Sequence, residues 1–394
     1  MTWATLRATF APSLTLPSLM SGTATWSAST SRPRRMSSDQ HGDLGRQRRV
    51  LVCSAPGRAG IIGNPTDMYG GAVLSCSIAL RARVTVVPSA RLVLETNGEE
   101  LEIAGRDDLR PRRDHFDVAR AVLDYLHLPV APPCHVRYES EIPLHSGLAG
   151  STALVVALLQ ALLAWQGKND PPYRLAERAR YVELNYLKVV CGYQDAYMCT
   201  FGGLNYMDFG GKQFYREAEA ELYATVEPLA AHLPPTGPGA EGSPPFVLGF
   251  TGVQHASGAV HKPIRERWLE GEAVVVDGYR RITEIARLGK KALLTVDWTL
   301  LGQLMNENHA IQRELGGSGE SNETLIGAAL DAGALGAKLA GAGHGGTIIA
   351  LWPWPDATPL ENALRDVGAS AIYRPEVDRG VTVESDKQEE MNKK

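Results

Sequence analysis

Cysteine is scarce in this chain: its 394 residues include five cysteines, which are well separated and form no CxxC pair. An odd number without metal-ligand spacing gives little support to a disulfide framework or a zinc site and favours buried free thiols in a reducing compartment. Long hydrophobic runs are also lacking, since the longest, residues 153–165, is interrupted by Gln160 and is too short to cross a bilayer. The formal net charge of −4 at pH 7 gives no general reason to bind nucleic acid or an anionic membrane. We therefore expect a soluble, cytoplasmic monomer or homodimer with no nucleic-acid or membrane partner.

Acidic residues are absent from residues 1–38, a segment with four arginines and many Ser, Thr and Pro residues. Such a composition cannot form a periodic apolar face, and it lacks the long apolar stretch of a secretory signal. Residues 1–45 are therefore predicted to be a disordered leader or an upstream extension. Between a transit-peptide-like leader and residues that precede a true start at Met36, we favour the second.

The rest of the chain has a globular composition, with 44% apolar residues, and alternates between strand-like and helix-like patterns. Strands are predicted at residues 49–54, 83–87, 91–95, 135–140, 246–251, 337–339, 347–351 and 370–374. Helices are predicted at residues 116–126, 152–165, 175–189, 262–270, 274–288, 300–315 and 322–332, the second of them apolar nearly all round and so a core helix. A Pro- and Gly-rich stretch at residues 233–245 predicts a boundary between domains 46–235 and 246–380, with a charged tail at 381–394.

The first of three glycine-rich motifs spans residues 56–71. Its glycines predict turn structure after the first strand and allow other groups to approach the backbone closely. It also supplies a cation, an amide, a carboxylate and a hydroxyl from Arg58, Asn64, Asp67 and Tyr69. This mixture of donors and acceptors suits a polyhydroxylated ligand, and a glycine-rich turn with solvated charges is the alternative.

The second motif spans residues 143–153 and leads directly into the predicted core helix. Small residues at a helix N-terminus leave backbone N–H groups open at its positive end, which favours phosphate. The motif is neither a Walker loop, because it lacks Gly-Lys-Ser/Thr, nor a Rossmann fingerprint. Ser151 and Thr152 either cap the helix or reach a metal-bound phosphate.

The third motif spans residues 339–347, between two predicted strands. Its glycines let the loop lie close against another surface or a bound nucleotide: Gly341, Gly343, Gly345 and Gly346. Taken alone, this motif is a weak signal.

In this order and at these separations, the three motifs resemble those of the GHMP kinases, the family of galactokinase, homoserine kinase, mevalonate kinase and phosphomevalonate kinase. The resemblance covers about residues 49–376. It implies a two-domain α+β fold, with a ribosomal S5 domain 2-like N-terminal domain and a ferredoxin-like C-terminal domain. It also implies ATP and Mg²⁺ as cofactors and a small-molecule sugar as substrate.

The resemblance also implies roles for individual residues. The ATP-binding residues would be Pro143, Ser146, Gly147, Leu148, Ala149, Gly150, Ser151 and Thr152. The acceptor would be bound by Asn64, Asp67, Tyr69 and Asp195, and the C-terminal glycine loop would support the closed site. Asp195 lies in a segment similar to that of the catalytic aspartate in the sugar-kinase branch, so it would be catalytic together with Arg58, with Ser151 and Glu183 as magnesium ligands. His344 departs from the family pattern, because many relatives have glycine there.

Residues 257–271 and 304–309, and the Gly-Asn-Pro-Thr-Asp wording of the first motif, resemble the glucuronokinase branch of the family. The implied reaction is phosphorylation of the anomeric hydroxyl of D-glucuronate to D-glucuronate 1-phosphate. The substrate carboxylate would need a cation. Candidates, unless they form the solvated face of a helix, are His261, Lys262, Arg265 and Arg267.

Three alternatives stay open. Another sugar kinase of the family would act on galactose, arabinose or a heptose phosphate. A non-catalytic sugar-binding member would share the fold, as the mevalonate diphosphate decarboxylases do, but it is less expected because Ser151, Glu183 and Asp195 are all present. In an unrelated α/β protein, the glycine-rich loops would be purely structural.

Overall fold

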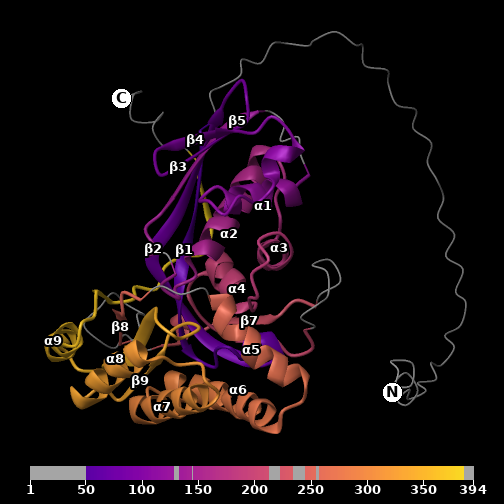
Figure 1. The fold of residues 1–394 in the computed structure, drawn as a ribbon. Helices are drawn as coiled ribbons and strands as arrows, with labels where there is room; N and C mark the ends of the chain where they lie inside the picture. Colours follow the sequence, from indigo (N-terminus) through magenta and orange to yellow (C-terminus); the bar gives the residue numbers. More distant parts are fainter. Residues whose placement is uncertain are drawn as a thin grey trace, which may run out of the picture. The chain divides into compact units, whose positions relative to one another are not determined.

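A computed structural model describes residues 50–127, 133–143, 145–212, 222–233, 245–253 and 257–385, with only the backbone of 257–262 and of Ser385. All of these residues belong to one compact unit, Gln47–Lys394. The leader predicted for residues 1–45 and residues 234–244 of the predicted domain boundary lie outside the described residues. Figure 1 shows a long twisted sheet and a smaller sheet, each accompanied by helices.

The larger sheet has eight strands, in the order β12-β1-β2-β5-β3-β4, with β6 pairing with both β2 and β7. Its strands are β1 (Leu51–Ile62), β2 (Ala72–Pro88), β3 (Val93–Thr96), β4 (Glu99–Glu102), β5 (Cys134–Ser140), β6 (Leu204–Asp208), β7 (Thr225–Pro228) and β12 (Thr382–Ser385). Only the β3–β5 pair is parallel. Strand β2 pairs with β6 through residues 72–76 and with β5 through residues 82–88, so one long strand connects both ends of the sheet.

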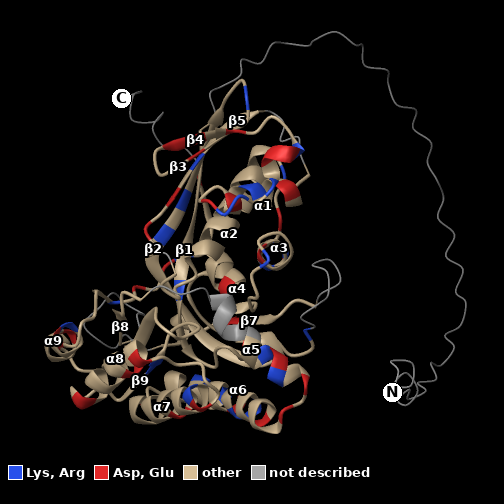
Figure 2. Cartoon of the chain, in the orientation of Figure 1, with Lys and Arg blue, Asp and Glu red and all other residues tan. Residues whose placement is uncertain are grey.

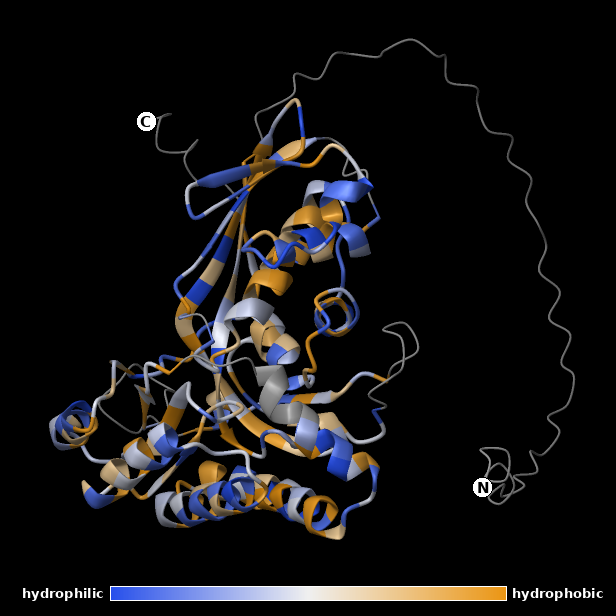
Figure 3. Cartoon of the chain, viewed as in Figure 1, coloured by the Kyte–Doolittle hydropathy of each residue, from blue (hydrophilic) through white to orange (hydrophobic). Residues whose placement is uncertain are grey.

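Four helices accompany this sheet: α1 (Asp117–Tyr125), α2 (Gly150–Trp165), α3 (Pro172–Asn185) and α4 (Gln194–Phe201). Helix α2 packs on β1 and β2 and is buried on nearly every side. It has no charged residue and is largely orange in the hydropathy colouring (Figures 2 and 3). A helix that is apolar all round is stable only inside a core, so the predicted core helix is confirmed.

The smaller sheet has the order β11-β8-β10-β9, and all its pairs are antiparallel. Its elements are β8 (Phe246–Phe250), α5 (Ser257–Leu269), α6 (Ala273–Leu294), α7 (Trp298–Glu314), α8 (Glu320–Asp331), β9 (Gly336–Leu339), β10 (Thr347–Leu351), α9 (Thr358–Asp366) and β11 (Ala371–Tyr373). Helix α6 packs on β2, and α7 packs on both β1 and β9. The largest core cluster therefore contains residues of both sheets, such as Val73 and Leu248. None of the described helices is both long enough and apolar enough to span a membrane.

Each predicted strand and helix is found, most with ends within a few residues, but β2 begins at residue 72 rather than 83 and α6 ends at residue 294 rather than 288. Strands β4, β6 and β7 and helix α4 were not predicted. Two further differences are instructive. Residues 57–62 continue β1 through two irregularities in its pairing with β2, so the prediction of a turn at these residues was wrong. The turn begins only at Gly63. Residues 382–385, within the predicted charged tail, form β12 beside β1. Three short 3-10 helices, Thr66–Tyr69, Arg106–Leu109 and Ala230–His232, complete the described elements.

Candidate active site

A cavity of about 510 Å³ lies where the three glycine-rich motifs meet. The first motif contributes Arg58, Asn64 and Asp67 to its wall, and the third contributes Gly341. The other sequence-predicted residues that line it are Ser146, Gly147, Ala149, Gly150, Ser151, Thr152, Glu183 and Asp195. The structure thus brings together residues that are far apart in the chain.

Backbone contacts hold the three motifs against one another. The Arg58 N–H donates to the Leu148 carbonyl oxygen at 3.0 Å, and the Gly60 N–H donates to the Ala340 carbonyl oxygen at 3.1 Å. A Cβ atom on Gly57 would lie 2.7 Å from the Leu148 oxygen, and one on Gly60 would lie 2.9 Å from the Ala340 oxygen. The glycines in β1 therefore serve close approach between motifs, which is why they do not end the strand.

The second motif forms the N-terminus of α2. The N-cap is Ala149, with a left-handed φ of 65°, and no side chain caps the helix. Ser151 and Thr152 lie in its first turn, so the capping role considered for them is wrong. The positive end of a sixteen-residue helix thus faces the cavity, where it favours a phosphate.

Arg58 and Asp195 form a tight ion pair in the cavity. The Arg58 Nε and Nη2 atoms each lie 2.7 Å from Asp195 Oδ1. The Arg58 Nη1 atom also donates to the carbonyl oxygens of Gly147 and Ala340, which fixes the guanidinium between the second and third motifs. The Asp195 side chain is 30% exposed and lies in the first turn of α4, so a ligand can reach its carboxylate.

Asp67 connects the first motif to the segment that carries Asp195. Its Oδ2 atom accepts hydrogen bonds from the backbone N–H groups of Tyr193, at 2.7 Å, and Gln194, at 2.9 Å. Burial raises the pKa of Asp67, and the Gln194 N–H opposes that rise. A Cβ atom on Gly192 would lie 1.9 Å from Asp67 Oδ2, so any larger residue there would displace the Asp67 carboxylate.

Glu183 is a buried carboxylate in the cavity wall. It accepts a hydrogen bond from the Thr152 hydroxyl, whose Oγ1 atom lies 2.9 and 3.0 Å from the two carboxylate oxygens. Burial, and then the negative charge of Asp195, raise its pKa to about 8. A carboxylate that ionises this reluctantly lacks a sufficient positive partner in its surroundings.

The donors at this wall fit a magnesium ion. The Glu183 carboxylate and the exposed Ser151 hydroxyl both line the cavity beside the α2 N-terminus. Carboxylate and hydroxyl oxygens are ligands of the kind that Mg²⁺ takes, and two protein ligands leave room for phosphate oxygens and water. A divalent cation would also offset the cost of ionising buried Glu183.

Several predicted site residues do not line the cavity. Tyr69 stacks on Tyr279 with ring centroids 4.5 Å apart and contacts Trp268 at 4.9 Å, so its sugar-binding role stays a prediction. Pro143 and Leu148 lie outside the lining, although the Leu148 carbonyl holds Arg58. The loop glycines beyond Gly341 are likewise outside it: Gly343, Gly345 and Gly346. They lie near other parts of the chain, since a Cβ atom on Gly343 would lie 1.7 Å from the Gly317 oxygen.

The two candidates for a substrate carboxylate whose side chains are described, Arg265 and Arg267, do not line the cavity. Arg267 binds Glu272 through two contacts of 2.7 Å and donates to the Leu315 carbonyl at 3.0 Å. The side chains of the other two candidates, His261 and Lys262, lie outside the described residues.

Three basic residues at or behind the cavity were missed by sequence reasoning. His145 and Lys188 are exposed, line the cavity and have left-handed φ values of 54° and 58°. Lys338 is fully buried on β9, and its Nζ donates to Asn64 Oδ1 at 2.7 Å. The sequence did offer one indication of Lys338, because it is a charged residue in a predicted three-residue strand that is otherwise apolar.

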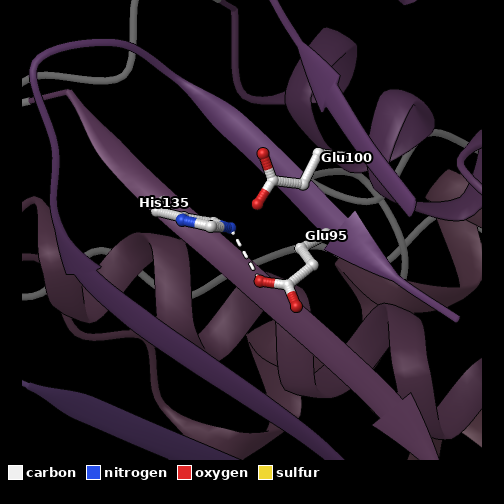
Figure 4. A group of neighbouring side chains, drawn as sticks. All are labelled: Glu95, Glu100 and His135. Atoms are coloured by element: carbon white, nitrogen blue, oxygen red, sulfur yellow. Dashed lines mark ion pairs between the residues drawn. The ribbon is translucent and has the colours of Figure 1, made fainter. Parts of the chain in front are cut away.

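A second group of titratable side chains lies on the larger sheet, outside the cavity lining. Glu95 and Glu100 are directly opposite each other on β3 and β4, and His135 lies on neighbouring β5 (Figure 4). Among the described residues, these form the only group of three or more His, Cys, Asp or Glu side chains whose ligand atoms all lie within 4.8 Å of one another. Glu95 already pairs with His135 at 2.9 Å and with Arg137 at 2.8 Å. We assign this edge cluster to charge compensation between strands.

Comparison with known proteins identifies the family. A model of the GHMP kinases N terminal domain matches residues 115–203, and one of the GHMP kinases C terminal domain matches residues 290–370. A galactokinase galactose-binding signature matches residues 42–88. These matches contain the second, third and first motifs, respectively.

Individual proteins agree with these matches. Mevalonate kinase of Methanothermobacter thermautotrophicus is 30% identical over 300 residues, 76% of this chain and 89% of that protein. Glucuronokinase 1 of Arabidopsis thaliana is 28% identical over 319 residues, 75% of this chain and 83% of that protein. The crystal structure of Lactococcus lactis galactokinase with galactose has a TM-score of 0.67 at 19% identity, over 84% of this chain and 95% of that one, and thus shares the fold. With its α+β fold and its three motifs around one cavity, this chain belongs to the GHMP kinase family.

Proposed function

We propose that this protein is an ATP- and Mg²⁺-dependent sugar kinase that phosphorylates the anomeric hydroxyl of D-glucuronate. The observation that carries the proposal is the Arg58–Asp195 pair, which lies in one cavity with the α2 N-terminus and with the polar residues of the first motif. A reachable carboxylate, a phosphate-binding helix end and a wall of sugar-binding groups are the parts that transfer of a phosphoryl group to a hydroxyl requires.

In the proposed reaction, the anomeric oxygen attacks the γ-phosphorus of ATP while the bond from that phosphorus to the bridging oxygen breaks and ADP leaves. The hydroxyl proton passes to Asp195, which Arg58 holds in place. The Arg58 guanidinium also stabilises negative charge on the transferred group, and the first-turn N–H groups of α2 hold the phosphates. Magnesium held by Ser151 and Glu183 would neutralise phosphate charge. Asn64 and Asp67 would bind the sugar.

Glucuronate is favoured over a neutral sugar by three features. Residues 257–271 and 304–309 resemble glucuronokinase, and a glucuronokinase is 28% identical to this chain. The first motif has Asn64 where the galactokinase wording has a glutamate, and an amide does not repel an anionic acceptor. His145 and Lys188 add basic groups to the cavity wall.

The proposal is tested with a substrate panel. The purified full chain would be assayed for ADP release from ATP·Mg²⁺ with D-glucuronate, galacturonate, galactose, arabinose and heptose 7-phosphate, and phosphorus NMR would locate the phosphate on the product. We expect the highest kcat/KM with D-glucuronate and the phosphate at the anomeric carbon. A higher kcat/KM with any other sugar would reassign the substrate.

Mevalonate belongs in the same panel as a second candidate, because a mevalonate kinase is 30% identical to this chain. Turnover of mevalonate without turnover of any sugar would replace the sugar-kinase proposal. If no acceptor releases ADP but a sugar raises the melting temperature, the chain is a sugar-binding protein. If ATP·Mg²⁺ does not bind in calorimetry, the kinase proposal is wrong.

We also propose a cytoplasmic location and a monomeric or homodimeric state. The location is supported by the cysteines, all five of which are free and four of which are buried, as is usual in a reducing compartment. Fractionation of the source cells and light scattering on the purified chain would test these two points.

A further inference from the structure

Lys338 is a fully buried lysine next to the candidate sugar site. Its Nζ atom donates to Asn64 Oδ1 at 2.7 Å and to the carbonyl oxygen of Leu339. Among the described residues, no carboxylate forms an ion pair with it, and the charge that acts on it is that of Arg58. The electrostatic surroundings of His309, on α7, also include Lys338.

This lysine is a costly residue for the fold. Burial, together with the positive charge of Arg58, lowers the pKa of Lys338 well below its ordinary value. An apolar side chain of similar length would fill the same space without this cost, because buried charges without counterions are expensive. The reason for a lysine must therefore lie in what its ammonium group contacts.

The contact with Asn64 fixes the orientation of an amide. The other amide atom of Asn64 faces the Gly341 carbonyl oxygen, which can only accept, so that atom must be the nitrogen and the atom that faces Lys338 Nζ must be the oxygen. The Asn64 Nδ2 atom donates to the Gly341 carbonyl oxygen at 3.3 Å, which leaves one N–H of that nitrogen. Asn64 lines the cavity, so this remaining N–H is a donor that it can offer to a ligand.

We infer that Lys338 is a positioning residue that holds Asn64 with its N–H toward the acceptor substrate, where it donates to the substrate carboxylate. The inference rests on the proposed function for the identity of that carboxylate. Asn64 would then complement Asp67, a carboxylate in the same wall that can accept from sugar hydroxyls. The two residues give the wall opposite polarity at neighbouring points, which is what a uronate requires.

The test is a double-mutant cycle with K338M and N64A in the purified full chain. Each single change should raise the KM for D-glucuronate about tenfold, the usual effect of losing a hydrogen bond to a charged group, with kcat and the KM for ATP within about twofold. The double variant should be no worse than N64A, because Lys338 acts through Asn64. K290M, which removes an ammonium group that pairs with Glu227 at 2.5 Å, is the matched control and should leave all constants unchanged.

Two results would overturn the inference. One is an additive effect, in which K338M raises the KM of N64A as much as that of the parent chain. The other is an equal loss in kcat and in both KM values, which indicates a purely structural role.

If K338M does not fold, N64D is the second test variant, because the introduced carboxylate would still accept a hydrogen bond from Lys338. This variant should raise the KM for D-glucuronate at least about a hundredfold through like-charge repulsion. The inhibition constant of D-glucose, the neutral analogue that differs at C6, should change much less. Equal changes for both sugars would contradict the inference. The cycle is run with the best acceptor of the panel. If the parent chain does not use glucuronate, the proposed function is wrong. If the effects of K338M and N64A on KM are additive, the positioning role of Lys338 is wrong.

Discussion

Two groups of charged side chains on this protein compensate their charge in different ways. In the edge cluster, Glu95 has a partner for each oxygen, His135 at 2.9 Å and Arg137 at 2.8 Å. The Arg137 hydrogen bond lowers the pKa of Glu95, so its charge is favoured. At the cavity wall, burial raises the pKa of Glu183, and behind the wall burial lowers the pKa of Lys338, so charge is disfavoured on both.

The difference indicates which charged groups a bound ligand would stabilise. An exposed charge with a neighbour of opposite sign gains little from a further partner, since water and the neighbour already stabilise it. A buried charge without sufficient compensation gains much from a bound cation, phosphate or carboxylate. The cavity residues should therefore control activity, while the edge cluster should not.

The largest effect is expected for Asp195. Replacing it with asparagine keeps the size of the side chain but removes the proton acceptor and the ion pair with Arg58. We expect kcat to fall by about 10³ to 10⁴ in the ADP-release assay. ATP binding, measured by calorimetry, serves as the control and should persist. Turnover close to that of the parent chain would remove Asp195 from the mechanism.

A smaller loss is expected for Arg58→Lys. Lysine keeps the charge but cannot contact Asp195 and the carbonyls of Gly147 and Ala340 at the same time. We expect kcat to fall by about 10² to 10³, as when a group that stabilises the transition state is lost. If this conservative change had no effect, the buried guanidinium would behave like a surface charge, and the distinction between the cavity and the edge cluster would be wrong.

Glu183→Gln should act on metal use and on stability. We expect the Mg²⁺ concentration for half-maximal rate to rise at least about tenfold. Because the folded pKa of Glu183, about 8, lies above its ordinary value of 4.5, its contribution to stability is full below pH 4.5 and is lost as the pH rises through about 8. The glutamine variant avoids this loss, so without ligand it should melt at a higher temperature than the parent chain at pH 8 and above. An equal melting temperature would show that Glu183 is already compensated.

Much of the fold could be predicted from the sequence because it depends on local pattern. Helix α2 has no charge on any face, so it had to be buried, and the structure confirms this. The first motif's glycines were expected both to form a turn and to allow close approach, and at residues 57 and 60 only the close approach is confirmed, because the tertiary structure alone distinguishes the two. Short β12 carries no strong strand signal of its own, and its place depends on pairing with β1.

The candidate site could be predicted in part. Arg58 was found because it lies in the first motif, whereas Asp195 and Glu183 were assigned because the chain around and before Asp195 resembles that of the sugar-kinase branch. The structure brings all three to one cavity. Lys338 was missed because nothing in a short apolar strand says that its lysine faces Asn64. Tyr69 was expected at the sugar because of its hydroxyl; its ring contacts Tyr279 and Trp268, and it does not line the cavity, so this role stays a prediction. Side-chain direction after a turn cannot be read from spacing alone.

The smallest effect is expected in the edge cluster. Glu100→Ala removes a carboxylate that lies directly opposite another one, so it relieves repulsion as well as removing a polar group. We expect a change in unfolding free energy within about 0.5 kcal/mol by urea titration and kcat/KM within about twofold of the parent chain.

His135→Ala is its companion and should lose only the contact with Glu95. At about 1 M NaCl, where the screening length is about 3 Å, both differences should shrink further, while the effect of Arg58→Lys should remain because that pair is largely buried. A loss of activity in either edge variant would mean that compensation by neighbours does not separate the two clusters, and that the exposed group also takes part in function.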